Sequence, residues 1–157
     1  MTRFEDLLLL PLDLPLPADI NINGLDSIDY SEMYRDEYRN CYHINLFTSK
    51  FEPTEQMSLF PELSKWLHQV VFPRFLGRVM IIVTRPQDKN HLHIDCSPKK
   101  FQTLQHKFRF VIQGNVDSLV FTFRDKTEKR PYNTKKPFIM NGKWPHYMFN
   151  NSDKRKY

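Results

Sequence analysis

The stretch VMIIVTRPQDKNHLHID, residues 79–95, joins an apolar segment to a polar turn and then to a second short segment. Residues 79–84 and 91–95 predict two consecutive strands, because both segments are short and are bounded by turn residues. Side chains two positions apart on a strand point to the same side, with their Cα atoms roughly 6.6–7 Å apart. His93 and Asp95 can therefore converge on a single ion.

A third ligand is expected from another strand. His91 lies on the same side of its strand, but it is about 13 Å from Asp95 along an extended chain. His146 follows Pro145 much later in the sequence. Two histidines and one carboxylate form the ligand set that binds Fe(II) on one face and leaves the other positions open. An HxD tripeptide alone is weak evidence, but with its surroundings the predicted metal ligands are His93, Asp95 and His146.

The second half of the chain predicts a series of short strands. Residues 1–157 are expected to form one domain, in which 1–78 supply supporting helices and strands and 79–157 form the core with the metal site. Strands joined by short turns and preceded by helices predict a mainly β protein, a double-stranded β-helix of the jelly-roll type. The expected strands are 79–84, 91–95, 107–113, 119–124, 138–140, 147–150 and a last one starting at Arg155.

One or two helices are expected outside this sheet, in the first half of the chain. Residues 61–72 show an apolar stripe at helical spacing, with a proline in the first turn and another after the end. Residues 31–42 could form a second, short helix, because tyrosines recur there every fourth residue.

The last 21 residues, 137–157, read PFIMNGKWPHYMFNNSDKRKY. They contain a short apolar strand, a glycine turn, the Pro145-His146 pair, a second strand, the turn 150–153 and a basic end. This order resembles the distal-histidine segment of the Fe(II)/2-oxoglutarate-dependent oxygenases, especially their aspartyl/asparaginyl β-hydroxylase-like and phage-encoded branches. With the HxD pair included, the resemblance covers roughly residues 79–157.

The resemblance implies a 2-oxoglutarate-dependent dioxygenase that acts as a hydroxylase. It implies Fe(II) and 2-oxoglutarate as cofactors, O₂ as oxidant, and succinate and CO₂ as co-products. In that family a basic residue about ten positions after the distal histidine pairs with the far carboxylate of 2-oxoglutarate. Lys156 lies ten positions after His146 and Arg155 nine, so Lys156 is the better match and Arg155 the alternate. The substrate stays open: a protein side chain, an amino acid, a nucleobase or a small metabolite.

Composition limits the partners. The net charge of +5 is spread along the chain, and an anionic cosubstrate accounts for basic residues near the site, so a nucleic-acid partner is not expected. No glycine-rich phosphate-binding motif occurs in the sequence. The apolar run at 7–10 is too short for a membrane span and lacks the basic start of a signal peptide. Two cysteines do not make a disulfide framework, which predicts a cytoplasmic protein, in the host cytoplasm if it is viral.

Alternatives remain at this stage. A non-catalytic jelly roll, for example a viral structural protein, would use the same strands with ordinary polar residues at the three positions. A zinc or cupin-type enzyme could instead use His91 and His93. Along 107–111 basic and aromatic residues alternate, which places Arg109 either near the cosubstrate or on the surface. We predict that Arg109 lies on the surface.

Overall fold

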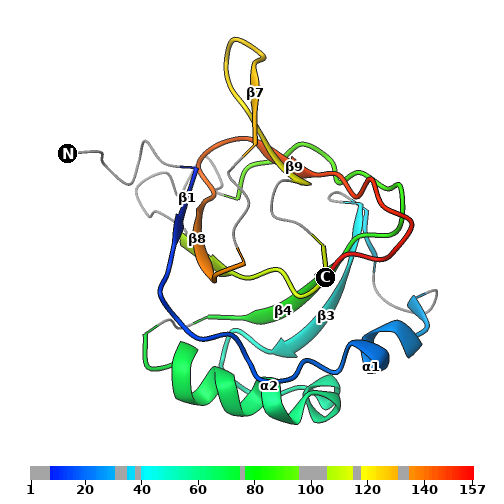
Figure 1. The fold of residues 1–157 in the computed structure, drawn as a ribbon, viewed down its shortest axis with the longest axis vertical. Helices are drawn as coiled ribbons and strands as arrows, with labels where there is room; N and C mark the ends of the chain where they lie inside the picture. The colour runs from blue at the N-terminus through cyan, green and yellow to red at the C-terminus, as the bar shows by residue number, and fades with distance from the viewer. Residues whose placement is uncertain are drawn as a thin grey trace.

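The computed structural model describes residues 8–30, 35–37, 40–74, 77–95, 106–114, 118–130 and 135–157, and in these the protein is mainly β, as expected. The strands curve around a common centre, with helices α1 and α2 outside them on one side (Figure 1). The strands are β1 (Leu9–Pro11), β2 (Arg35–Asp36), β3 (Cys41–Phe47), β4 (Val79–Val83), β5 (His106–Arg109), β6 (Leu119–Thr122), β7 (Glu128–Lys129), β8 (Phe138–Asn141) and β9 (His146–Met148). The helical segments are α1 (Ile22–Ser27), η3 (Glu55–Leu59), α2 (Pro61–Trp66) and η4 (Leu67–Val71).

One layer joins two three-stranded sheets through the end of the chain. The sheets have the orders β2-β3-β4 and β1-β8-β5. Thr84, just after β4, forms an antiparallel bridge with Lys156. The backbone N–H of Tyr157 donates to the Gln113 carbonyl oxygen at 3.3 Å, and that of Ile112 donates to the Tyr157 carbonyl oxygen at 3.0 Å. The C-terminal residues therefore lie between β4 and the continuation of β5.

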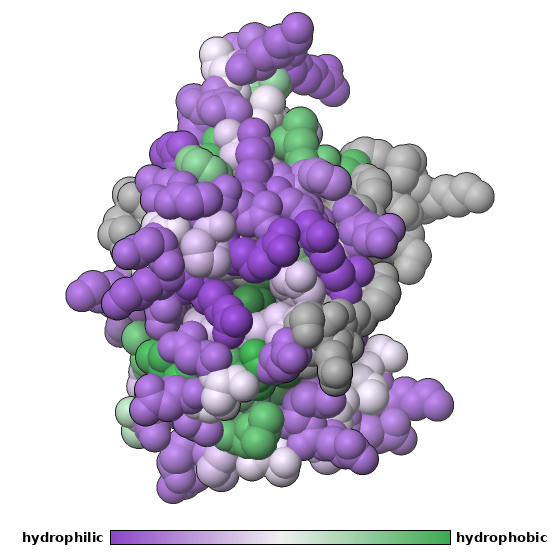
Figure 2. All heavy atoms as spheres, turned by 90° about the vertical axis from the view of Figure 1, so that its right-hand side faces the viewer, coloured by the Kyte–Doolittle hydropathy of each residue, from purple (hydrophilic) through white to green (hydrophobic). Residues whose placement is uncertain are grey.

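A second layer has the order β7-β6-β9 and is extended by residues 89–93. The strand expected at 91–95 is not a regular strand. Instead, two isolated bridges join residues 89–93 to β9 and its continuation, Lys89 to Phe149 and His93 to His146. The hairpin that carries β7 projects at the top of Figures 1 and 2, where its surface is mostly hydrophilic. The HxD segment thus runs beside the strand that contains the distal histidine.

The predicted helix at 61–72 is confirmed as α2 followed by η4. Its apolar stripe packs in a cluster with Ile44, Leu46, Ile81 and Val83 of β3 and β4. Leu63, Trp66, Leu67 and Val71 are its buried members. In the described part of the chain, no helix combines the length and apolarity needed to cross a membrane. The face in Figure 2 is hydrophilic over most of its area, with hydrophobic patches in its lower half, at the level of α2.

The aromatic side of β5 faces this helix. The ring centroid of Trp66 lies 6.1 Å from that of Phe108 and 5.1 Å from that of Phe110. Because side chains alternate across a strand, Lys107 and Arg109 point to the opposite face, away from the helix.

The helix predicted for 31–42 is wrong where the structure describes this segment; residues 31–34 and 38–39 lie outside the described residues. Arg35–Asp36 is a strand that pairs with Tyr42 and Cys41 of β3. Asn40 has a φ of 55°, a left-handed conformation that asparagine tolerates in tight turns. Strand pairing with β3 thus outweighs the local tyrosine periodicity.

Candidate metal centre

His93 and His146 lie opposite each other on neighbouring antiparallel segments. The backbone N–H of His93 donates to the His146 carbonyl oxygen at 3.0 Å, and that of His146 donates back at 2.9 Å. Opposed residues in such a pair project from the same face of a sheet. Their ring centroids are 4.6 Å apart, and both residues are buried. Strand pairing therefore brings together two histidines that are far apart in the sequence.

The two imidazoles are oriented by backbone carbonyls. Nδ1 of His93 lies 2.7 Å from the His91 carbonyl oxygen, and Nδ1 of His146 lies 2.8 Å from the Trp144 carbonyl oxygen. Since a carbonyl oxygen only accepts, each Nδ1 carries a hydrogen, and in the neutral ring each Nε2 then keeps its lone pair. Burial lowers the pKa of His146 to about 4, partly opposed by the negative charge of Asp95. Its ring is neutral near pH 7, the form that binds metal.

Asp95, two residues after His93 on the same segment, also reaches the two histidines. Its backbone N–H donates to the Gly142 carbonyl oxygen at 3.0 Å. A Cβ at position 142 would lie 2.7 Å from the Cβ of Asp95, closer than real side chains approach. Gly142, in the turn between β8 and β9, therefore permits this contact. The sequence marked a glycine turn here, but only the structure shows which side chain it admits.

The three side chains converge. Oδ2 of Asp95 lies 3.4 Å from Nε2 of His146, and Oδ1 lies 3.8 Å from Nε2 of His93. One ligand atom from each residue lies within 4.8 Å of the others. Among the described residues, the buried atoms Asp95 Oδ2 and His146 Nε2 make no hydrogen bond. Buried polar atoms normally have a partner, and a shared ion with bonds of roughly 2.0–2.2 Å fits these donors. Two neutral imidazoles and one carboxylate are donors suited to Fe(II).

Two basic residues of β5 also reach Asp95. Nζ of Lys107 is 2.5 Å from Oδ1, and a guanidinium nitrogen of Arg109 is 3.6 Å from Oδ2. Burial alone would raise the pKa of Asp95, but the charges of Arg109 and Lys107 outweigh it and hold that pKa below its ordinary value. The surface position predicted for Arg109 is therefore wrong. The signal that could have found both residues is the alternation along 107–111, since one face of this strand had to point inward.

A cavity of about 1010 Å³ lies next to Asp95 and its basic partners. Besides His93 and His146, its wall includes Lys107, Arg109 and Lys156, together with apolar residues of β4, β5 and β6. The cavity thus brings the two candidate histidine ligands together with basic side chains of the first layer.

Lys156 is buried, with 6% of its surface exposed, and it lines this cavity. A Cβ at position 114 would lie 2.1 Å from the Lys156 Cε, so Gly114 leaves the space through which this side chain passes. Gly114 has a φ of 110°, a conformation that other residues rarely adopt. This glycine therefore contributes directly to the inward course of Lys156.

Arg155 points the other way. Its guanidinium carbon lies 4.5 Å from the ring centroid of Tyr30, and Nη1 donates to the Asp26 carbonyl oxygen at 3.0 Å. It is not among the residues that line the cavity described above. Of the two basic residues that the sequence singled out for the cosubstrate, Lys156 faces the cavity and Arg155 the outer side.

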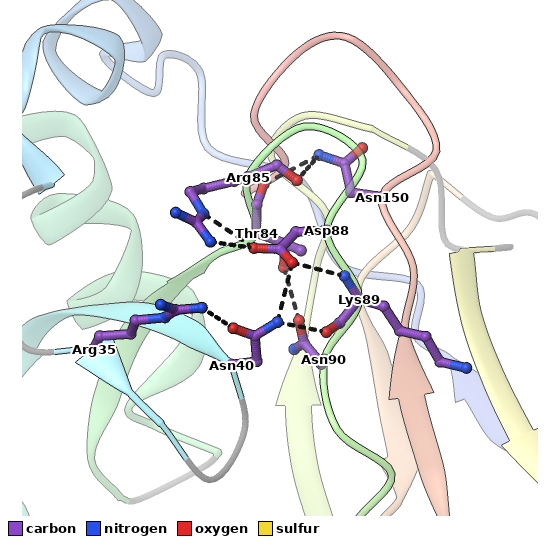
Figure 3. A network of polar contacts seen from close by, with 8 residues as sticks. All are labelled: Arg35, Asn40, Thr84, Arg85, Asp88, Lys89, Asn90 and Asn150. Atoms are coloured by element: carbon purple, nitrogen blue, oxygen red, sulfur yellow. Dashed lines mark hydrogen bonds and ion pairs between the residues drawn. The ribbon is translucent and has the colours of Figure 1, made fainter.

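A polar network holds the turn before the HxD segment (Figure 3). Asp88 accepts from Nε and Nη2 of Arg85 at 3.0 and 2.8 Å and from Nδ2 of Asn40 at 3.0 Å. Asn150, which is buried, donates to the carbonyl oxygens of Thr84 and Arg85 at 3.1 and 2.9 Å. The network ties the turn between β4 and His93 to the asparagine turn that precedes Lys156, so it positions both ends of the site.

Together, fold and site define a mainly β protein with a candidate mononuclear metal centre inside its cavity. Comparison with known protein families, curated proteins and solved structures finds no match to this chain.

Proposed function

We propose that this protein is an Fe(II)- and 2-oxoglutarate-dependent oxygenase built on a double-stranded β-helix. The strand order supports the jelly roll. From β4 onward, the first layer holds β4, β5, β8 and 156–157, and the second layer holds 89–93, β6, β7 and β9. Along the chain the segments therefore alternate between the layers, except that β6 and β7 follow each other in the second layer. This alternation between two facing sheets is that of an eight-stranded jelly roll.

The observation that carries the proposal is a candidate metal site and a buried lysine at one cavity, which His93, His146 and Lys156 line. His93, Asp95 and His146 offer the two-histidine, one-carboxylate set typical of non-haem Fe(II) oxygenases. Lys156 lines the same cavity as a buried cation. A dicarboxylate such as 2-oxoglutarate needs a charged partner for the end that does not reach the metal, because an unpaired buried charge is costly.

The chain supplies geometry, charge and a shielded pocket. Fe(II) with 2-oxoglutarate and O₂ supplies oxidative decarboxylation to succinate and CO₂, coupled to hydroxylation of a substrate C–H bond. The carbonyl oxygens of His91 and Trp144 keep the two Nε2 atoms aimed at the ion. Lys156 binds the far carboxylate of the cosubstrate. Phe121, fully buried with its ring centroid 5.8 Å from that of His146, keeps water away from the back of the site.

The test is an anaerobic titration of the protein with Fe(II) and 2-oxoglutarate, followed by the weak visible charge-transfer band of the chelated complex. We expect the band in the wild-type protein and in His91→Ala, a matched control, because His91 is exposed and contributes to the site through its backbone carbonyl. We expect no band in His146→Ala. A wild-type protein without the band would refute the proposal.

The same titration, followed by a succinate assay in the presence of O₂, separates the alternatives. A non-catalytic jelly roll gives neither the band nor 2-oxoglutarate-dependent succinate. A zinc or cupin-type enzyme binds a metal but is indifferent to 2-oxoglutarate.

A further inference from the structure

The carboxylate of Asp95 contacts a lysine as well as the two histidines. The side chain of Asp95 is fully buried, whereas that of Lys107 is 35% exposed and contacts Oδ1 at 2.5 Å. At this distance the contact is a charge-assisted hydrogen bond, among the stronger polar interactions in proteins. The carboxylate of Asp95 would therefore bind any metal and the ammonium group of Lys107 at the same time.

Arg109 differs from Lys107 in geometry and exposure. Its nearest guanidinium nitrogen is 3.6 Å from Oδ2, and its side chain is 18% exposed. Lysine carries a compact charge on a flexible four-carbon stem, while the guanidinium is planar and delocalised. Lys107 is thus the closer and more exposed of the two cations.

We propose that Lys107 is a positioning residue that opposes the metal and sets its affinity. The inference rests on the proposed metal centre. A divalent ion bonded to Asp95, His93 and His146 would lie a few ångströms from the Lys107 ammonium, and the two positive charges would repel each other more strongly inside the protein than in water. The ammonium also withdraws electron density from Oδ1, which makes the carboxylate a weaker metal ligand.

This arrangement has two consequences, and a purely structural lysine would produce only the first. Lys107 should stabilise the metal-free protein, because it neutralises a buried carboxylate. It should weaken metal binding, because part of that stabilisation is lost when a second cation arrives. Removing its charge therefore has opposite effects on the stability of the metal-free protein and on the affinity for the metal.

The experiment measures Mn(II) affinity of the full chain by calorimetry, without cosubstrate, in wild type, Lys107→Met, Lys107→Gln and Lys107→Arg. Lys107→Gln keeps a hydrogen-bond donor near Oδ1 without the charge, which guards against loss of folding in Lys107→Met. Lys65→Met, on the exposed side of α2, changes the net charge equally and is the matched control.

We expect Lys107→Met and Lys107→Gln to tighten Mn(II) binding by about ten-fold, equivalent to about 1.4 kcal/mol, and to lower the melting temperature of the metal-free protein only. Lys107→Arg and Lys65→Met should bind like wild type. Unchanged or weaker Mn(II) binding in the two neutral variants would overturn the inference and leave the metal centre intact. A wild-type protein that binds no Mn(II) would overturn both.

Discussion

The two functional ends of the cavity are built in different ways. The histidines are set by direct pairing of two short segments, His93 against His146, in the second layer. Lys156 is set by the C-terminal residues, which lie between β4 and the continuation of β5 in the first layer. The metal end therefore depends on one local register, whereas the lysine end depends on how the C-terminal residues join the two sheets of the first layer. Substitutions at the two ends should have separable effects.

The largest effect is expected at the metal end. Asp95→Ala and the isosteric Asp95→Asn remove the anionic ligand, so Fe(II) binding and succinate production should fall beyond the roughly 10–100-fold that loss of an outer-shell partner costs. The fold should persist, which circular dichroism can check. Near-normal succinate production in either variant would show that Asp95 is not a ligand.

At the other end, Lys156→Ala should raise the 2-oxoglutarate concentration needed for half-maximal turnover by roughly 10–100-fold, the value of a charge-assisted hydrogen bond. Fe(II) affinity should change much less, because the ligands are untouched. Arg155→Ala is the matched control, since its guanidinium stacks on Tyr30 outside the cavity. The reverse result, with Arg155→Ala impaired and Lys156→Ala normal, would mean that the register of the C-terminal residues is wrong by one residue.

A smaller effect is expected at Gly142. Gly142→Ala places a methyl group against the Cβ of Asp95 and should displace the carboxylate, weakening Fe(II) binding by about ten-fold. The 2-oxoglutarate requirement at saturating metal should stay close to normal. The neighbouring exposed substitution Lys143→Ala tests whether the turn itself is sensitive. Equal losses in both variants would argue against a specific contact with Asp95.

A further effect, on stability instead of ligand binding, concerns the pH dependence of the metal-free protein. His146 titrates near pH 4 in the folded protein and near 6.5 when unfolded. The unfolded chain therefore binds an extra proton between these values, and the free energy of unfolding should fall as the pH drops from 6.5 toward 4, by up to about 3 kcal/mol. His146→Phe should flatten this slope in denaturant titrations with a chelator present. An unchanged slope would mean that His146 is not buried as a neutral ring.

Much of this protein follows from local periodicity. The spacing of two between His93 and Asp95 and the apolar stripe of α2 depend on geometry within one strand or helix, so both could be predicted. The alternation in β5 predicted that Lys107 and Arg109 share a face, but not which face points inward. That choice depends on Trp66, which packs against Phe108 and Phe110 from a distant helix.

The sequence by itself determined the mainly β class, the outer helix at 61–72 and the candidate ligands, because hydrophobic period and ligand chemistry are properties of neighbouring residues. Only the tertiary structure decided that 35–36 pair with β3 instead of forming a helix, that Gly142 admits Asp95, and that Lys156 faces the cavity while Arg155 faces out. The physical reason is that each of these outcomes depends on strand register and on contacts between segments far apart in the chain, which no local pattern encodes.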